Sequence, residues 1–372
     1  MIRMIIEFTI VILGMASTFI LYFHFPALPS VQENILKYPS ISVIIPARNE
    51  EKNIALLLKD LKTQTIALHE IICVNDLSED KTSQIAAKYG ARVINIKNKP
   101  NGWIGKSWAA QNGANIATGE LLLFLDADVR VKKDGIKMLI QTYLKEDCTV
   151  SVQPYHKTNK MYEQFSMFFN LIQISANGIA LPKPKNTGLY GPVILIPKSD
   201  YIKIGGHESV RQSIVEDMAL GAELKKANIS FSLFIGNQNI YFRMYSDGFL
   251  ALLQGWTKNI SSGATRTPLI VFIMVFLWIS SLISVPVQIV KFAILQNWPL
   301  LITCSALYII WVLILIFLSK RVGNFKVYSI IFYPILMFVT LCVCIVSMFK
   351  KIFNIKVKWK GRTIDMGKKH EK

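Results

Sequence analysis

The sequence predicts an α/β domain built on a doubly wound, mostly parallel sheet and flanked by transmembrane helices. Two observations predict this fold class. Between residues 38 and 266, short apolar runs alternate with polar helical stretches, the pattern of strands and helices in a parallel sheet. Outside that region lie four apolar runs. Each holds about 20 residues, the length that a membrane-spanning helix needs.

The composition agrees with a membrane protein. Of 372 residues, 52% are hydrophobic, which is high for a soluble protein. The formal net charge of +18, from 42 basic and 24 acidic residues, suits nucleic acid, anionic lipid or phosphate-bearing substrates. The apolar runs favour lipid and phosphate, so no nucleic acid partner is expected.

The cysteines and histidines argue against two common kinds of site. None of the five cysteines forms a Cys-x-x-Cys pair, so we expect reduced thiols and a cytoplasmic catalytic face rather than a disulfide framework. The five histidines are scattered without metal-ligand spacing, which argues against zinc.

The apolar runs define the expected domain boundaries. The first covers residues 4–25 and is expected to span a membrane, against a signal peptide, because no clear small-x-small cleavage site follows. Three more runs close the chain, at 268–290, 298–318 and 327–348. The expected parts are an N-terminal transmembrane helix at 1–27, an α/β domain at 38–266, C-terminal membrane helices at 267–349 and a basic tail at 350–372.

Two basic clusters complicate the topology of the last run. Lys320, Arg321 and Lys326 precede it, and six basic residues between 350 and 362 follow it. The positive-inside rule places both clusters in the cytoplasm, which a single crossing between them cannot satisfy. We therefore hypothesise that 327–348, which carries Pro334, is re-entrant or lies partly in the membrane interface. The expected location is the cell membrane, multi-pass, with the α/β domain facing the cytoplasm.

Within the α/β region the elements follow in a regular order. The expected strands are 41–46, 70–75, 92–96 and 120–126, and the expected helices are 51–63, 79–88 and 105–117. Residues 161–181 form an apolar and aromatic segment with scattered polar residues. A core helix is one interpretation of that segment, and a helix on the membrane surface is the other.

Polar motifs follow three of the expected strands. In open α/β sheets, ligands bind beyond the carboxyl ends of the strands. One strand leads into Pro46, Ala47, Arg48, Asn49 and Glu50, another ends in Asn75 and Asp76, and a third ends in Asp126-Ala-Asp128. We therefore expect these motifs to lie along one edge of the sheet and to form a site there.

Asp126 and Asp128 are the expected metal ligands. They are two residues apart at the end of an apolar strand, so they share a side if the backbone is extended. Paired carboxylates suit a hard cation such as Mg²⁺ or Mn²⁺, which would also hold phosphate oxygens. A polar turn after a strand is the alternative interpretation.

Two loops are expected to bind a nucleotide. Asp76 can accept hydrogen bonds from a base or ribose, and capping of the next helix by Asp76 or Ser78 is the alternative. The loop ending in Gly105 and Lys106 opens a helix, where glycine permits close backbone approach and the helix N-terminus favours anions. This loop suits a diphosphate, against an ordinary loop that packs Trp103.

Glu216 and Asp217 open a further helix. Acids in a first turn gain from the helix dipole, so capping is one interpretation. A general base for an incoming nucleophile is the other. A leaving group would need stabilisation as well, which the metal, Lys106 and either Arg243 or Lys258 could supply.

The segment Gln254-Gly-Trp256-Thr-Lys258 lies just before the C-terminal apolar runs. Trp256 could close over a bound substrate. An aromatic residue at the membrane interface is the alternative interpretation.

Taken together, these motifs resemble those of family 2 glycosyltransferases, which are inverting enzymes with the GT-A fold. The resemblance covers about residues 40–265, and 44–50, 75–76, 126–128 and 216–217 correspond to the family's uridine, metal and base motifs. It implies a UDP-sugar co-substrate, Mg²⁺ or Mn²⁺, and a membrane lipid as acceptor. The implied roles are catalytic for Asp217 and Glu216, metal-binding for Asp126 and Asp128, and donor-binding for Pro46, Ala47, Arg48, Asn49, Glu50, Asn75, Asp76, Gly105, Lys106, Asp126, Gln254, Trp256 and Lys258.

Further motifs are similar to those of family members that glycosylate carotenoid acids. They lie at 151–156, 205–207, 242–245, 255–258 and 357–362. This similarity implies transfer of glucose from UDP-glucose to the carboxylate of an apocarotenoid, and contacts with other enzymes of a pigment pathway.

The chain departs from the family in one motif. Processive members carry Gln-x-x-Arg-Trp, whereas here Gln254 is followed by Gly-Trp-Thr-Lys, which favours a single transfer. A carboxylate acceptor is already ionised near pH 7, so Asp217 could orient it instead of acting as a base. Two other hypotheses stay open: the same donor chemistry on a hopanoid, ceramide or diacylglycerol, and a non-catalytic membrane scaffold that binds nucleotide.

Overall fold

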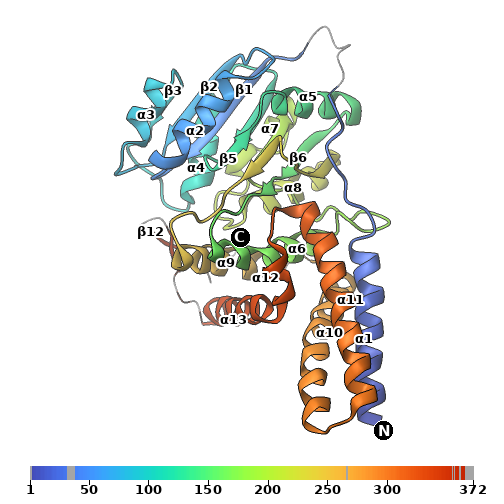
Figure 1. The fold of residues 1–372 in the computed structure, drawn as a ribbon. Coiled ribbons are helices and arrows are strands. Elements are labelled where there is room, and N and C mark those ends of the chain that lie inside the picture. Colours follow the sequence, from blue (N-terminus) through green and yellow to red (C-terminus); the bar gives the residue numbers. More distant parts are fainter. Residues whose placement is uncertain are drawn as a thin grey trace. The chain divides into compact units, whose positions relative to one another are not determined.

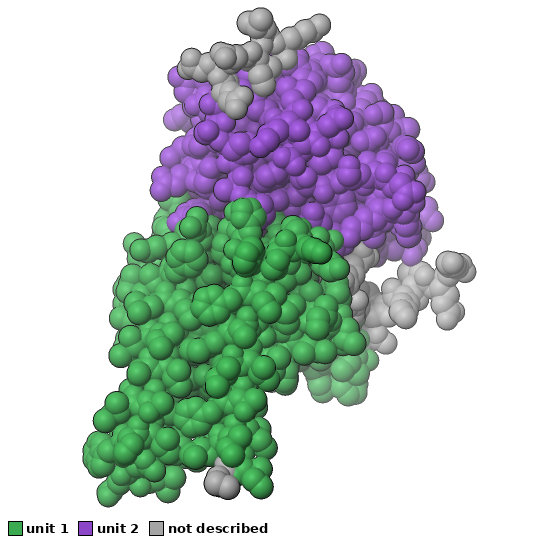
Figure 2. Space-filling view, turned by 90° about the vertical axis from the view of Figure 1, so that its right-hand side faces the viewer, with its two compact units in different colours: residues 1–25, 157–185, 245–353 green, residues 26–156, 186–244, 354–372 purple. Residues whose placement is uncertain are grey.

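The computed structural model describes residues 2–31, 38–264, 267–353, 355, 357–359 and 362–364. The chain divides into two compact units, which Figure 2 colours separately. Unit 1 holds residues 1–25, 157–185 and 245–353, and unit 2 holds 26–156, 186–244 and 354–372. Residues 157–185 and 245–264 thus group with the apolar helices and not with the sheet, although the sequence places them inside the α/β region.

Unit 2 is built on the sheet that the sequence predicts (Figure 1). Within the described residues, its seven strands lie in the order β3-β2-β1-β4-β8-β6-β9. The first four are parallel, β8 runs antiparallel between β4 and β6, and β9 is parallel to β6. The bounds are β1 Ile41–Ala47, β2 Glu70–Asn75, β3 Arg92–Asn95, β4 Leu121–Leu125, β6 Thr149–Gln153, β8 Val193–Pro197 and β9 Phe231–Ile235. The predicted doubly wound, mostly parallel sheet is confirmed.

The helices of unit 2 also follow the predicted order, with one shift. The helix expected over 79–88 begins at Thr82, because the Asp80 carboxylate accepts the amide protons of Glu51 and Thr82 and holds the preceding residues in a loop. The bounds are α2 Glu51–Lys62, α3 Thr82–Lys88, α4 Gly105–Ile116, α5 Gly135–Glu146, α7 Lys198–Lys203, η2 Gly206–Glu208 and α8 Glu216–Lys226.

The centre of the sheet is buried on both faces, as expected for parallel strands between helices. Val43 and Ile45 of β1 pack with Leu123 of β4 and Leu57 of α2 in one apolar core. On the other face α4 lies very close to β1, since a Cβ added at Gly113 would come within 2.5 Å of the Ile44 side chain. This close packing fixes the position of α4, whose first turn carries Lys106.

A small second sheet adjoins the end of β4. Its order is β5-β10-β7, with β5 at Val129–Val131, β7 at Tyr155–His156 and β10 at Ile240–Phe242. β5 begins directly after Asp128, so this sheet anchors one side of the Asp126–Asp128 turn. A two-stranded hairpin, β11 Val357–Trp359 and β12 Arg362–Ile364, lies near the C-terminus.

Unit 1 contains three long helices that run in a common direction in Figure 1. These helices are α1 Ile2–Leu21, α10 Leu269–Ile294 and α11 Trp298–Val322. Small residues let α1 and α10 approach closely, since a Cβ added at Gly14 would lie 2.2 Å from the Ser281 Cβ. A Lys291–Glu7 ion pair of 2.8 Å joins the same two helices.

The last predicted apolar run is broken in two. It forms α12 Val327–Ile331 and α13 Tyr333–Ile352, separated at Phe332, with Pro334 in the first turn of α13. Proline lacks an amide proton and clashes with the preceding turn, which explains the break. In the described part of the chain, α1, α10, α11 and α13 are long and apolar enough to span a membrane.

The apolar segment 161–181 forms η1 Met161–Phe165 and α6 Ser166–Asn177. Met167, Phe168 and Phe169 are buried, so the interpretation as a core helix is confirmed. The core concerned is that of unit 1, because α6 packs against α10, α11 and α13. The remaining helix of the unit is α9, Phe249–Ala264.

Candidate active site

The Asp126-Ala-Asp128 motif forms a turn and does not continue strand β4. The Val129 amide donates to the Asp126 carbonyl at 3.1 Å, which closes a four-residue turn, and the Asp126 amide donates to the Pro192 carbonyl at 3.0 Å. The expectation of extended geometry at this motif is therefore wrong. The reason is local: β5 must leave the main sheet to pair with β10 in the small sheet.

Lys106 is the centre of a charged cluster beside this turn. Its Nζ lies 2.7 Å from Asp126 Oδ1 and 3.0 Å from Glu216 Oε1. Lys106 comes from the first turn of α4, Asp126 from the end of β4 and Glu216 from the first turn of α8. The fold thus brings together three motifs that the sequence analysis treated separately.

Asp217 completes the cluster and is held by the backbone. Its Oδ2 accepts the Gly191 amide proton at 2.7 Å, and its Oδ1 accepts the Met218 amide proton at 2.8 Å. A Cβ added at Gly191 would lie 2.8 Å from Asp217 Oδ2 and 3.2 Å from Lys106 Nζ. Only glycine fits at position 191 without displacing both charged groups.

These residues line one small cavity in unit 2. Its walls include Pro46 of the predicted nucleotide motif, together with Lys106, Ala110, Phe124, Leu125, Asp126, Gly191, Ile194, His207, Glu216 and Asp217. The predicted residues Pro46, Lys106, Asp126, Glu216 and Asp217 therefore share a site. Carboxylates of Asp126, Glu216 and Asp217 face a single ammonium among these lining residues, so the cluster carries excess negative charge.

The cluster shifts the pKa values of its members. Burial works to lower the pKa of Lys106, but Asp126, Glu216 and Asp217 outweigh it and hold that pKa well above its usual range. Burial and the neighbouring Glu216 raise the pKa of Asp217 to about 6, with Lys106 acting in the opposite direction. Lys106 is therefore a permanent cation, whereas Asp217 titrates just below neutral pH.

The rest of the predicted nucleotide motif, residues 47–50, is tied to the loop after β2. Arg48 Nη1 donates to the carbonyls of Asp76 and Leu77 at 2.9 and 2.7 Å, and the Asp76 amide donates to the Ala47 carbonyl at 2.8 Å. The Asn49 amide donates to Ser78 Oγ at 3.0 Å. These bonds join the two loops into one surface at the carboxyl ends of β1 and β2.

The side chains of Asn75 and Glu50 also serve the structure of these loops. Asn75 Oδ1 accepts the Ser78 amide proton at 3.1 Å, and Glu50 Oε2 accepts from Asn53 Nδ2 at 2.8 Å. Asp76 is buried, at 4% exposure. Nucleotide binding by this surface stays a prediction.

The predicted diphosphate site is the N-terminus of α4. No side chain caps this helix, and its first turn holds both Gly105 and Lys106. The Ile104 amide donates to the Arg211 carbonyl at 2.9 Å, which fixes the entry of the chain into the helix. Diphosphate binding here stays a prediction, and the structure adds that Lys106 already faces Asp126 and Glu216.

Trp256, Gln254 and Lys258 belong to α9 in unit 1. Trp256 is buried at 3% exposure, stacks on Phe169 with ring centroids 4.7 Å apart, and donates to Ser166 Oγ at 3.3 Å. Tyr245 packs edge-on against the same indole. In this conformation Trp256 supports the core of unit 1, and its expected role over a substrate stays a prediction.

A divalent metal could bind at this turn only if other groups also supplied ligands, since the turn offers two carboxylates. Among the described side chains, no group of three or more His, Cys, Asp or Glu residues could hold a metal ion. Asp126 and Asp128 offer hard carboxylate oxygens, which suit Mg²⁺ or Mn²⁺ when diphosphate oxygens supply the other ligands. Such an ion would share the Asp126 carboxylate with Lys106.

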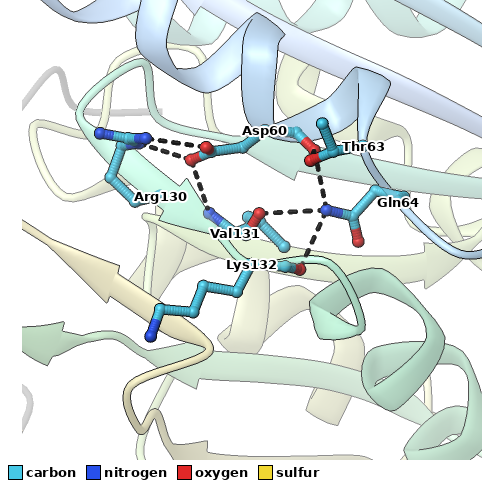
Figure 3. A network of polar contacts seen from close by, with 6 residues as sticks. All are labelled: Asp60, Thr63, Gln64, Arg130, Val131 and Lys132. Carbon is cyan, nitrogen blue, oxygen red and sulfur yellow. Dashed lines mark hydrogen bonds and ion pairs between the residues drawn. The ribbon is translucent and has the colours of Figure 1, made fainter.

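A polar network fixes strand β5, which follows the Asp126-Ala-Asp128 motif (Figure 3). Arg130 of β5 pairs through two nitrogens with the Asp60 carboxylate near the end of α2, which also accepts the Val131 amide proton at 3.3 Å. Gln64 Nε2 donates to the carbonyls of Asp60, Val131 and Lys132, each at 3.0 Å. The network joins α2, the helix after residues 46–50, to the strand after Asp128.

His207 is a cavity residue that the sequence analysis did not select. Its Nδ1 lies 2.8 Å from the Tyr201 hydroxyl, which also accepts the His207 amide proton at 3.0 Å. Burial lowers the pKa of His207 to about 4, with Glu216 opposing and Lys106 reinforcing the shift, so the ring is neutral at pH 7. The only sequence signal was its place in Gly205-Gly-His207, which marked a family motif without a role.

Asp217 gives the site an expected pH dependence. Because its pKa is about 6 in the folded chain and 3.8 ordinarily, the folded state holds its proton up to a higher pH than the unfolded state does. Its stabilising contribution is therefore fully present below pH 3.8 and is lost as pH rises through 6. We expect kcat/KM to move oppositely, falling about tenfold per unit below pH 6 as the carboxylate protonates.

Comparison of the wild-type chain with Asp217→Asn isolates this titration. Activity and melting temperature are measured from pH 5 to 8. As pH rises through 6, the wild-type chain should gain activity and lose stability. The Asp217→Asn variant should show neither change near pH 6. A profile that is identical in both proteins would remove Asp217 from the pH dependence.

Comparison with known proteins gives one family. Residues 42–205 match the model described as Glycosyl transferase family 2. A 4,4'-diaponeurosporenoate glycosyltransferase of Staphylococcus haemolyticus (strain JCSC1435) is 36% identical over 336 residues, covering 87% of this chain and 88% of the relative. The protein of the same description from Staphylococcus aureus (strain USA300) is 34% identical over 343 residues, covering 89% and 90%.

A solved structure shares the fold. The mannosyltransferase PcManGT from Pyrobaculum calidifontis, in complex with GDP-Man and Mn²⁺, matches with a TM-score of 0.55 at 13% identity, over 94% of this chain and 99% of that chain. At this identity the likeness concerns the fold alone, and it confirms the GT-A fold class.

Proposed function

Because this chain belongs to glycosyl transferase family 2, we propose that it transfers glucose from UDP-glucose to the carboxylate of an apocarotenoid such as 4,4'-diaponeurosporenoate. Such a transfer would be a step in the biosynthesis of a carotenoid pigment such as staphyloxanthin. The observation that carries this proposal is the similarity to diaponeurosporenoate glycosyltransferases over nearly the whole length of both chains. The acceptor is inferred from that similarity. The roles of individual residues in the transfer are inferred from the cluster around Lys106.

The proposed step breaks one bond and forms one. A carboxylate oxygen of the acceptor attacks the anomeric carbon of the sugar from the face opposite the diphosphate, so configuration inverts. The bond from that carbon to the phosphate oxygen breaks, and its electron pair leaves with UDP. An ionised acceptor has no proton to lose.

With an ionised acceptor, Asp217 and Glu216 would position Lys106. Both carboxylate oxygens of Asp217 accept backbone amide protons, and Glu216 Oε1 is held by Lys106. Asp217 and Glu216 would fix the position of Lys106, and a base becomes unnecessary because the acceptor is already ionised.

Lys106 would stabilise the charge that develops on the departing diphosphate. A fixed cation next to a leaving group is worth more in a partly buried site than in water. A divalent cation held by Asp126 and Asp128 would neutralise further phosphate charge when it is bound. Loops 46–50 and 75–76 would hold the uridine, and His207 would present a neutral imidazole to the cavity.

The chain is proposed to act at the cell membrane, as a multi-pass protein with unit 2 in the cytoplasm. The long apolar helices of unit 1 support membrane association. The flanking basic residues support the orientation, because Lys and Arg are enriched on the cytoplasmic side. Contacts with other pigment enzymes would follow from a shared lipid-soluble substrate.

Purified full-length protein allows a direct test of donor and acceptor class. With apocarotenoid acid and Mn²⁺, UDP release is expected from UDP-glucose. UDP release from UDP-N-acetylglucosamine, and GDP release from GDP-mannose, should be weak at most. Omitting the acid should abolish the release. Release that depends on ceramide or diacylglycerol, but not on the acid, would show that the acceptor is a hydroxyl lipid.

A further inference from the structure

Helix α13 differs in direction from the other helices that are long enough to span a membrane. In Figure 1, α1, α10 and α11 run in a common direction, and α13 runs across them, as α9 does. All five helices belong to unit 1. Spanning helices tilt by about 20° on average and rarely beyond 40°. A helix that lies across three spanning neighbours therefore cannot span the same membrane.

The contacts of α13 agree with this direction. The start of α13 is bonded to the long helices: Tyr333 donates to the Leu282 carbonyl of α10 at 3.1 Å and stacks on Tyr308 of α11. Further along, Ser347 Oγ donates to the Thr257 carbonyl of α9. The body of α13 packs against α9 and not along α10 or α11.

The exposed face of α13 is apolar along the whole helix, with Phe338 at 67%, Ile345 at 66% and Ile352 at 70% exposure. The buried polar residues of the helix, Thr340 and Ser347, lie on the face that packs on the protein, together with buried apolar residues. An apolar outer face on a helix of 20 residues needs a non-aqueous neighbour along its entire length.

Basic residues lie at both ends of the α12–α13 segment. Lys320 and Arg321 close α11, Lys326 precedes α12, and Lys350 and Lys351 close α13. If α13 spanned the membrane, one of these groups would lie outside. If it lies in the membrane plane, all of them reach the anionic headgroups of the cytoplasmic leaflet.

We infer that α13 lies in the plane of the cytoplasmic leaflet, with its Phe338–Ile345–Ile352 face in the lipid, and that the chain crosses the membrane three times, through α1, α10 and α11. Lys350 and Lys351 at the end of α13 are then cytoplasmic, and the short connection between α10 and α11 is external. The Lys291–Glu7 pair lies at the external end of that bundle, where α10 ends and α1 begins. This inference holds whatever sugar or acceptor the enzyme uses.

Spin labels on α13 test the inference in the intact protein in lipid nanodiscs. Cys342 and Cys344 are replaced by alanine, and the three other cysteines of the chain are buried. One cysteine at a time is then added at Phe338, Ile345, Phe349 or Ile352. The depth of each label is measured from the ratio of its collisions with oxygen and with a water-soluble nickel complex. The matched control is the exposed face of α11, with labels at Ile302, Ile309, Leu313 and Phe317.

The expected result is one shallow depth for all positions on α13. On α11 the depth should rise to a maximum near the middle of the helix and fall again. The same central maximum on α13 would overturn the inference, because it is the pattern of a spanning helix. A second outcome would also overturn the inference: labels on α13 that collide with neither reagent and whose spectra are broadened by labels on another chain. The exposed face would then be covered by a second copy of the protein.

Discussion

Replacing Asp128 with alanine should lower the rate of UDP release by at least about 100-fold. Asp128 lies in the turn between β4 and β5, and alanine removes one of the two carboxylates proposed for the cation. Replacing Asp126 instead would also remove the 2.7 Å pair that it forms with Lys106. Transfer and Mn²⁺ binding should both weaken, the latter measured from the electron paramagnetic resonance signal of unbound Mn²⁺.

The control for this change is Asp147→Asn. Asp147 is an exposed acid in unit 2 that ends α5 with a left-handed backbone, φ 47°, which asparagine tolerates. It should retain wild-type activity and Mn²⁺ affinity. If Asp128→Ala kept full activity with normal Mn²⁺ dependence, the metal assignment would be refuted.

Replacing Lys106 with methionine should have an effect of similar size. The variant keeps the packing volume but leaves Asp126, Glu216 and Asp217 without their common cation. The leaving diphosphate also loses a fixed positive charge, which costs about 100- to 1,000-fold in kcat at comparable sites. Like-charge repulsion should raise the pKa of Asp217 further, so the acid limb of the pH profile should move to higher pH.

Lys198→Met is the matched control for Lys106→Met. Lys198 is another partly buried lysine of unit 2, and its Nζ donates to the Ala117 carbonyl at 2.6 Å, outside the cavity lining. A similar change in melting temperature in both variants, with activity lost only in Lys106→Met, would separate a role in transfer from a role in folding. Wild-type kcat in Lys106→Met would remove Lys106 from the mechanism.

The parallel half of the sheet could be predicted because its signals are local. Runs such as 120–126 are apolar from end to end, and each is followed by a polar motif whose spacing marks the strand end. The same rule placed Asp126 at the correct sheet edge. The prediction of extended backbone beyond Asp126 was wrong, because the pairing of β5 with β10 depends on residues more than 100 positions away.

Other features of the site depend on contacts that no local pattern records. Gly191 precedes β8 in an unremarkable Gly-Pro-Val sequence, yet its amide fixes Asp217. His207 becomes a cavity residue only because Tyr201 and Phe124 pack around it. The sequence around Trp256 is compatible both with a residue that closes over a substrate and with a core residue. Its stacking on Phe169 is visible only in the structure.

The most direct test of the proposed function is to express the full chain in a host that makes 4,4'-diaponeurosporenoate and to weigh the extracted pigments by mass spectrometry. The wild-type chain should produce a pigment heavier by one hexose residue, which mild alkali converts back to the acid because the bond is an ester. The Asp128→Ala chain, present in the membrane at the same level, should not. Unchanged pigments with wild-type protein in the membrane, or a hexose that resists alkali, would contradict transfer of a sugar to the carotenoid carboxylate.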